Sequence, residues 1–269
     1  MEPDPALRAY EAFAVIYNDF NHGNDYEKWL GRVLLPELRK RGLPARGRAL
    51  DVGCGTGRAF RALLRRGWEV EGCDLSPAML DVAAIEGKGE VRLSRADMRD
   101  LPHIGNFDLV LSLNDSINYL LGDADLTQAL SAMRGNLAED GLLLFDVNSS
   151  STYASAYFGD RQVEHDGSRW LWRGRGEVRP AVFESEITGD RLPEPIRHLE
   201  RFRSKEEVRK AMREAGLAVL AALGMREEGD KMLLSDPLDE RRDYKLVFIG
   251  AKTEGALKPG KSRRLIDKP

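Results

Sequence analysis

Several residue types and patterns are scarce in this sequence of 269 residues, and each scarcity excludes a class of protein. Cys54 and Cys73 are the only cysteines, too few for a disulfide framework or a cysteine metal cluster. No apolar run approaches the ~18 residues of a membrane-spanning helix. Met1 is followed by acidic residues and prolines rather than by a positively charged leader. We therefore expect a cytoplasmic protein with reduced cysteines, no metal and no membrane partner.

An excess of charge of one sign is also missing. The 41 Lys and Arg residues nearly balance the 44 Asp and Glu residues, and the formal net charge is −3. Proteins that bind nucleic acid through its phosphates carry basic surfaces, which this composition does not indicate. The locally basic end KPGKSRRLIDKP, residues 258–269, is expected to be a solvated tail. Nucleic acid is therefore not the expected partner.

The pattern of the chain changes three times along its length. Residues 1–42 place aromatic side chains at helical spacing, and Pro36 is expected to kink or restart the second helix. Residues 43–148 alternate five strands with helices, which is typical of a parallel sheet wrapped on both faces. Residues 149–203 alternate with period two between Gly and Pro residues, which indicates antiparallel strands. A helix with a capping box and two further strands complete residues 204–252.

These patterns predict an α/β fold in which residues 1–252 form one domain. Its centre is a doubly wound, seven-stranded, mostly parallel sheet. We expect a helical flap at residues 1–42, a cofactor-binding core at 43–148, an inserted antiparallel β lid at 149–203, and the C-terminal part of the core at 204–252. Residues 253–269 are the tail. The oligomeric state stays open, with a homodimer as one alternative.

A glycine-rich turn follows the first predicted strand. The stretch RALDVGCGTGRAF, residues 48–60, places Gly53, Gly55 and Gly57 at alternate positions just after Asp51. Glycines let a ligand approach the backbone closely, and doubly wound sheets bind ligands at the carboxyl ends of their strands. The dinucleotide turn G-x-G-x-x-G has its third glycine one residue later, and the Gly-Lys-Ser/Thr of a P-loop is missing. A carboxylate beside the turn suits a ligand with a positive group.

Five motifs stand in order at the ends of predicted strands: LDVGCGTG, VEGCDLS, RADMRDLP, FDLVLSLNDSINYL and LAEDGLLLFDVN. Together they resemble the class I methyltransferases that use S-adenosylmethionine, over about residues 10–252. The resemblance implies a Rossmann-like fold and S-adenosylmethionine as the cofactor. It implies cofactor contacts by Tyr17, Tyr26, Trp29, Asp51, Gly53, Cys54, Gly55, Gly57, Asp74, Leu75, Met79, Asp97, Met98 and Asn114.

Some of these contacts have distinct expected roles. Asp74 would accept from both ribose hydroxyls, because a carboxylate is a two-lobed acceptor, and Asp97 would accept from the adenine amino group. Asn114 would line the methionine end. Purely structural roles stay open, above all core filling by Met79 and packing by Cys54. The flap aromatic residues can equally seal the flap on the sheet.

The acceptor is inferred mostly by elimination. NDSINYL, residues 114–120, departs from the (N/D)PP(Y/F) sequence of methylases that act on exocyclic base amines, and neither cysteine follows a proline. The flap and this segment are similar to small-molecule members that methylate amino sugars and other amines. We therefore expect methyl transfer to nitrogen or oxygen of a small-molecule acceptor. A protein or RNA methyltransferase, or a non-catalytic cofactor-binding protein of the same fold, are the alternatives.

Three residues are candidates for catalysis. Tyr119 is expected near the acceptor. His198 shares one face of a predicted strand with Glu200, so it can serve as a base with Glu200 as its partner or as a substrate contact. His22 lies in the turn of the flap and is a second candidate base.

Overall fold

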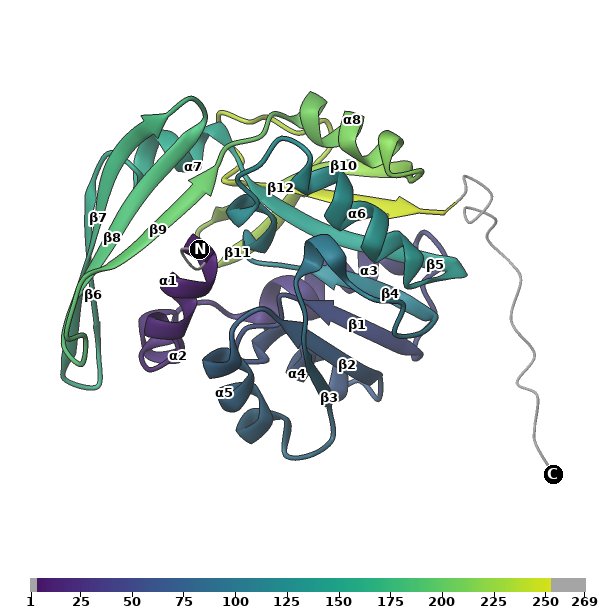
Figure 1. Cartoon of the computed structure of the whole chain (residues 1–269). Helices are drawn as coiled ribbons and strands as arrows, with labels where there is room; N and C mark the ends of the chain where they lie inside the picture. Colours follow the sequence, from purple (N-terminus) through teal and green to yellow (C-terminus); the bar gives the residue numbers. More distant parts are fainter. Residues whose placement is uncertain (1–3, 253–269) are drawn as a thin grey trace.

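The computed structural model describes residues 4–252, which are organised around two β-sheets (Figure 1). An eight-stranded sheet forms the centre of the larger body, and a four-stranded sheet stands beside it. The predicted tail, residues 253–269, lies outside the described residues. In the described part of the chain, no helix combines the length and apolar character needed to cross a membrane.

The central sheet has the order β11-β10-β12-β5-β4-β1-β2-β3. Strands β3, β2, β1, β4 and β5 run parallel to one another, whereas β12, β10 and β11 are antiparallel to their neighbours. The strand order reverses between β1 and β4, which is where doubly wound sheets bind their ligands. The strands are β1 (Arg48–Val52), β2 (Glu69–Asp74), β3 (Arg92–Arg95), β4 (Phe107–Ser112), β5 (Leu137–Asn148), β10 (Ala218–Glu228), β11 (Lys231–Ser235) and β12 (Lys245–Ala251).

The doubly wound α/β prediction is confirmed, but the predicted count of seven strands is wrong. Strand β11 is the eighth and forms a hairpin with β10, with Glu228 opposite Lys231. The two-residue turn between them begins with Gly229 at a φ of 58°, a conformation that glycine adopts at little cost. The charged residues around this turn hide the hairpin from an analysis of apolar periodicity. Strand β5 is the longest of the parallel strands and runs from Leu137 to Asn148.

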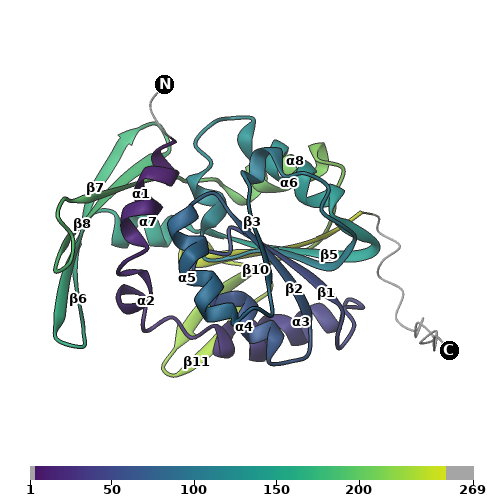
Figure 2. The same cartoon turned by 60° about the horizontal axis from the view of Figure 1, so that its bottom comes forward.

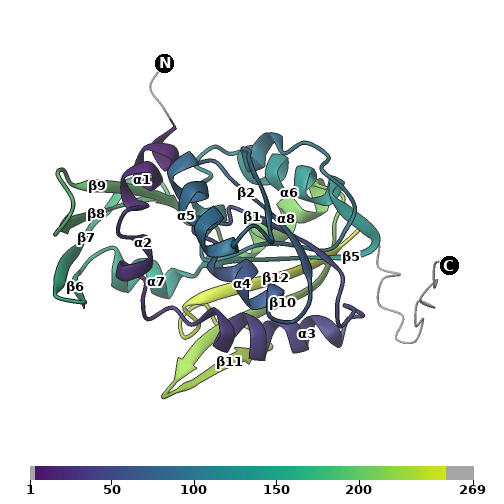
Figure 3. The ribbon, with the colours of Figure 1, turned by 90° about the horizontal axis from the view of Figure 1, so that it is seen from below.

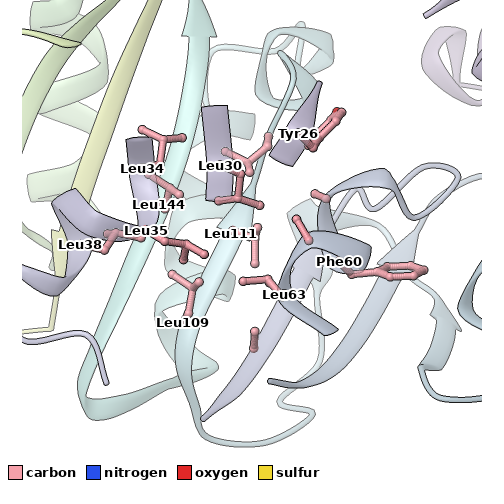
Figure 4. Packing of buried hydrophobic residues seen from close by; sticks show 14 of the residues in the cluster. Tyr26, Leu30, Leu34, Leu35, Leu38, Phe60, Leu63, Leu109, Leu111 and Leu144 are labelled. Atoms are coloured by element: carbon pink, nitrogen blue, oxygen red, sulfur yellow. The ribbon is translucent and has the colours of Figure 1, made fainter. Parts of the chain in front are cut away.

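Alternate side chains of the strands enter two cores on opposite faces of the central sheet. Leu109 and Leu111 of β4 pack with η1 (Glu27–Leu34), α3 (Leu35–Arg39) and α4 (Arg58–Leu64), as Figure 4 shows. Val110 packs instead with helices α6 (Asp125–Gly135) and α8 (Lys205–Glu214). Figure 2 shows these helices on the two sides of the sheet. Burial on both faces explains why these strands read as nearly continuous apolar runs.

The four-stranded sheet has the order β6-β7-β8-β9 and is antiparallel throughout. Its strands are β6 (Asp160–His165), β7 (Ser168–Arg179), β8 (Val182–Gly189) and β9 (Ile196–Arg201). It matches the predicted lid, although a helix that the sequence analysis does not anticipate, α7 (Ser150–Ala156), precedes it. The lid is a separate sheet, because none of its strands pairs with the described strands of the central sheet.

Helices α1 (Pro5–Phe13) and α2 (Tyr17–Phe20) of the N-terminal flap lie between the small sheet and helix α5 (Pro77–Gly87), as Figure 3 shows. The flap continues with η1, a π-helix that leads into α3, and these two pack on the central sheet. Pro36 lies in the first turn of α3, which agrees with the predicted restart. The buried side chains that join the flap to the small sheet include Phe13, Phe20, Trp170, Ile187 and Ile196.

Candidate active site

The glycine turn after β1 has the conformation that its sequence requires. Gly53, Gly55 and Gly57 all have positive φ values, of 70°, 53° and 83°. Gly57 is the N-cap of α4, and a Cβ at this position would lie 2.1 Å from the ring of Phe60. Gly55 has open space where a Cβ would stand, and its N–H donates to Asp74 Oδ2 at 2.8 Å. The turn is therefore closed on the helix side and open at Gly55.

An open cleft lies over this turn. Its walls come from the glycine turn, the ends of β2 and β4, the segment after β3, and the flap. Of the predicted cofactor contacts, it is lined by Tyr17, Tyr26, Asp51, Gly53, Cys54, Gly55, Asp74, Leu75, Asp97, Met98 and Asn114. The tertiary structure thus brings together most of the residues that the sequence placed at one site.

Three predicted cofactor contacts lie elsewhere. Trp29 is buried in the core between η1 and the central sheet, and it lines a separate pocket beside β11. Met79 is fully buried between α5 and the flap, so it fills the core. Gly57 caps α4 behind the cleft wall. The sequence analysis does not name Thr56 and Arg58, which do line the cleft and bind the flap by side-chain hydrogen bonds to Asn18.

Two carboxylates lie beside the open side of the glycine turn. Asp51 is 1% exposed, and its Oδ2 has no hydrogen-bond partner among the described residues. Burial, and then the nearby charge of Asp74, raise the pKa of Asp51 to about 7. Asp74 accepts from the N–H groups of Gly55 and Ser76, at 2.8 and 2.9 Å, and burial raises its pKa too. An ionised carboxylate this deep is costly without a partner, so the cleft favours a cationic ligand.

Asp97 is held in an ion pair rather than left free. Both of its carboxylate oxygens accept from Arg99, and Nε of Arg99 lies 2.9 and 3.0 Å from them. The same guanidinium reaches Asp4 at 2.7 Å, at the start of the flap. The ion pair fixes the Asp97 side chain at the wall of the cleft and connects that wall to the flap. The lone pairs of the Asp97 carboxylate that do not bind Arg99 stay available to accept a hydrogen bond, such as one from an amino group.

A second cavity of about 460 Å³ lies between the flap, the small sheet and the ends of β4, β5 and β12. Tyr10, Tyr17, Asn114 and Tyr119 line both this cavity and the cleft over the glycine turn. The two spaces therefore meet at these four side chains. Nδ1 of His198 and the hydroxyl of Tyr119 are 3.0 Å apart, so the structure brings two of the three candidate catalytic residues together.

His198 and Glu200 both line the second cavity, as their common strand face predicted. Burial lowers the pKa of His198 to about 4, and its Nε2 has no hydrogen-bond partner among the described residues. Glu200 accepts from Asn148 at 2.9 Å and from the Tyr153 hydroxyl at 3.2 Å. Burial, and then the charge of Asp115, raise the pKa of Glu200 to about 7. At neutral pH His198 is therefore uncharged, and Glu200 is the group that can exchange a proton.

The third candidate, His22, lies apart from this pair. It is exposed in the turn between α2 and η1. Its ring stacks on that of His165 in the β6–β7 hairpin, with centroids 4.4 Å apart and an interplanar angle of 10°. The contact ties the flap to the lid, and we give His22 no part in the chemistry proposed below.

A buried charge cluster that the sequence analysis missed supports the junction of the two spaces. Asn114 and Asp115 have consecutive left-handed φ values of 61° and 60°. Their N–H groups donate to the two carboxylate oxygens of Asp146, at 2.6 and 3.0 Å. Lys245 donates to Asp146 and to Asp115, both at 2.6 Å. The available signal was an aspartate and a lysine inside otherwise apolar strands, at LLLFDVN and YKLVFIG.

Comparisons with known proteins agree with this geometry. Residues 49–141 match the family described as "Methyltransferase domain". The protein called "Putative methyltransferase GWCH70_2453", from Geobacillus sp. (strain WCH70), is 37% identical over 186 residues, which are 66% of this chain and 74% of that protein. The chain belongs to the S-adenosylmethionine-dependent methyltransferases.

Two further relatives have named acceptors. A dTDP-3-amino-3,6-dideoxy-alpha-D-glucopyranose N,N-dimethyltransferase of Streptomyces fradiae is 34% identical over 139 residues, 50% of this chain and 53% of that protein. The structure of CalS10, an amino pentose methyltransferase from Micromonospora echinaspora solved with bound S-adenosylmethionine, superposes with a TM-score of 0.67 at 25% identity. That alignment covers 90% of this chain and 96% of CalS10.

The residues at the first cleft fit S-adenosylmethionine, the cofactor of this methyltransferase. The buried Asp51 Oδ2 lacks a hydrogen-bond partner within residues 4–252, and Gly55 leaves the space that a bound ligand needs. A sulfonium and an ammonium group both supply the positive charge that Asp51 and Asp74 favour. The tyrosine rings at the junction also suit a cation, because the face of an aromatic ring carries negative charge.

Proposed function

We propose that this methyltransferase transfers a methyl group to the nitrogen of a small polar amine held in the second cavity. The observation that carries the proposal is the meeting of the two spaces at Tyr10, Tyr17, Asn114 and Tyr119. A donor in the first cleft and an acceptor in the second would face each other there. The second cavity, at about 460 Å³, has the size of a small-molecule site, and the two relatives with named acceptors methylate amino sugars.

We propose that the cofactor is held by the residues that line the first cleft. Asp74 takes the ribose hydroxyls, and Asp97 and Met98 lie against the adenine. Asp51 and Asn114 face the methionine end. Cys54 and Leu75 supply apolar wall, and Tyr17 and Tyr26 close the cleft from the flap. When bound, the cofactor supplies an activated methyl group on a positively charged sulfur.

The remaining task of the enzyme is alignment and control of one proton. Holding two reactants in line is worth about 7–11 kcal/mol, so most of the rate comes from positioning. We propose that Tyr119 and His198 orient the amine, because they are hydrogen-bonded to each other beside the junction. A pKa of about 4 makes His198 a weak base at neutral pH. Glu200, with a pKa of about 7, is our candidate to take the proton that the amine loses.

We propose domain boundaries on the same basis, namely which segments hold the cofactor and which enclose the acceptor. We propose a single methyltransferase domain over residues 1–252, in which 43–148 and 204–252 build the cofactor-binding core. The flap, residues 1–42, and the lid, residues 149–203, enclose the acceptor, since Phe13 and Phe20 of the flap and Trp172 and His198 of the lid line the second cavity.

The test combines a binding and a turnover measurement. Purified protein is titrated with S-adenosylmethionine and S-adenosylhomocysteine, and then assayed for S-adenosylhomocysteine release over a panel of small amines, alcohols and phenols. We expect methylation of a subset of the amines and binding of both cofactor forms. Turnover only with alcohols or phenols, or only with a protein or RNA, would contradict the proposed acceptor class and leave the cofactor assignment standing.

A further inference from the structure

Arg161 of strand β6 lies in the wall of the second cavity. Its guanidinium carbon is 5.6 Å from the ring centroid of Phe20 and 6.0 Å from that of Trp172. Phe20 belongs to the flap and Trp172 to strand β7, where it stands directly opposite Arg161 in the β-ladder. Contact with two aromatic rings holds the guanidinium in place while leaving donors at its edge.

Arg161 has no carboxylate partner among the described residues, which distinguishes it from three other arginines of the small sheet. Arg173 pairs with Asp160 at 3.3 Å, Arg175 with Glu186 at 2.7 Å, and Arg197 with Glu184 at 2.5 Å. Those three arginines lie on the same small sheet. The aspartate next to Arg161 in the chain, Asp160, is already paired. Arg161 therefore brings to the cavity a positive charge that the structure leaves unmatched.

The indole of Trp172 connects Arg161 to the proposed reaction centre. The Trp172 ring stacks on that of His198, with centroids 6.0 Å apart and an interplanar angle of 24°. The guanidinium of Arg161 is at the same distance from this indole, so it lies no more than twice 6.0 Å from the imidazole. A small molecule can span that separation and touch both groups. Arg161 is exposed, whereas His198 is buried, so the guanidinium stands toward the mouth of the cavity and the imidazole in its interior.

We propose that Arg161 is a specificity-determining residue that binds an anionic group, a phosphate or a carboxylate, on the acceptor. The acceptor would be an amine that carries this group at its other end and lies along the Trp172 indole, with the nitrogen beside Tyr119 and His198. A guanidinium suits such groups because its planar fork makes paired, charge-assisted hydrogen bonds to them. This inference rests on the proposed function, and it adds to it that the acceptor carries a negatively charged group.

The first test measures anion binding without any acceptor. Wild-type protein saturated with S-adenosylhomocysteine is titrated calorimetrically with inorganic pyrophosphate, and separately with malonate, at millimolar concentrations. The variants are Arg161→Met, Arg161→Lys and, as the matched control, Arg197→Met on strand β9, because neither Arg197 nor its partner Glu184 lines the cavity. We expect wild type to bind at least one of the two anions, and Arg161→Met to bind it about 10- to 100-fold more weakly. Arg161→Lys should regain part of the loss, and Arg197→Met should match wild type.

Either of two results would overturn the inference: binding of neither anion by wild type, or the same loss in Arg161→Met and Arg197→Met. Whether pyrophosphate or malonate binds more tightly distinguishes a phosphate from a carboxylate. The proposed function is judged separately, by methylation of matched amines such as glucosamine and glucosamine 6-phosphate. If amines are methylated but Arg161→Met has no effect on anion binding, the inference fails alone. If Arg161 binds the anion but no amine is methylated, the proposed function fails alone.

Discussion

The ammonium of Lys245 lies 2.6 Å from Oδ2 of Asp146, on the neighbouring strand of the central sheet, and both side chains are buried. Burial by itself disfavours the ammonium, yet Asp115 and Asp146 keep the pKa of Lys245 above its usual value. The other oxygen of Asp146 receives the N–H of Asn114, so this ion pair supports the strained turn at the junction of the two cavities. The Lys245–Asp146 ion pair therefore contributes both to the stability of the core and to the shape of the site.

Removing the ammonium should therefore damage both stability and binding. Lys245→Met leaves Asp115 and Asp146 buried without a cation, which typically costs about 3–5 kcal/mol. We expect a loss of that size in the free energy of unfolding, measured by urea denaturation, together with weaker S-adenosylhomocysteine binding. Lys231→Met, at an exposed lysine on β11, is the control and should change little. A loss below about 1 kcal/mol in Lys245→Met would show that the cluster does not depend on its cation.

Asp74→Ala should weaken cofactor binding. This carboxylate is the proposed acceptor for the ribose hydroxyls, and hydrogen bonds to a charged group contribute about 1.5–3 kcal/mol. Calorimetric titration with S-adenosylmethionine should show a loss in that range. Asp81→Ala, an exposed aspartate on α5, is the matched control. Unchanged affinity in a folded Asp74→Ala variant would remove Asp74 from the binding site.

Cofactor affinity should depend on pH through Asp51. Its pKa of about 7 in the free protein means that it is largely protonated below that pH. A cationic ligand stabilises the carboxylate and lowers this pKa, so binding at lower pH must release a proton. The affinity for S-adenosylmethionine should then rise with pH, by at most about tenfold per unit, up to about pH 7, and be level above it.

Asp51→Asn provides the control for this pH dependence. The amide has nearly the same shape as the carboxylate and does not titrate. The variant should therefore bind S-adenosylmethionine more weakly at high pH, and its affinity should not change with pH below neutrality. Equal affinities of wild type on the two sides of pH 7 would mean that Asp51 stays in one protonation state on binding.

The rate of methyl transfer should depend on pH through Glu200. With a pKa of about 7, Glu200 gains its ability to accept a proton as the pH rises through neutrality. We expect kcat with an amine acceptor to rise across this range, and Glu200→Gln to lose this step together with about 10²-fold or more in kcat. Cofactor affinity should stay the same, because Glu200 lines the second cavity and not the first cleft.

Glu184→Gln on strand β8 is the control for Glu200→Gln, since Glu184 pairs with Arg197 on the same sheet and lines neither cavity. It should retain both kcat and the pH profile. If kcat of the Glu200→Gln variant still rises as the pH passes through neutrality, the proton transfer belongs to another group or to solvent.

The site could be predicted from the sequence where its parts are local. The positive φ values of Gly53, Gly55 and Gly57, and the positions of Asp51 and Asp74 at strand ends, follow from short motifs whose backbone conformation depends on neighbouring residues. The period-two alternation put His198 and Glu200 on one strand face, and both line one cavity. Periodicity could not decide between the alternatives for Met79 and Trp29, because an apolar side chain on a helix fills a core and lines a pocket with the same spacing.

By itself, the sequence determined the doubly wound α/β core, the glycine turn and the antiparallel strands of the lid, since each depends on periodicity or on a local motif, and the resemblance of its motifs gave the cofactor. Only the tertiary structure decided that the lid is a separate sheet and which distant residues meet. It joined Lys245 to Asp146 and Tyr119 to His198, across separations of 99 and 79 residues. It also left Arg161 without a carboxylate partner within residues 4–252. The physical reason is that ion pairing and pKa shifts depend on distance and burial, and both are set by how the flap, the lid and the central sheet pack together.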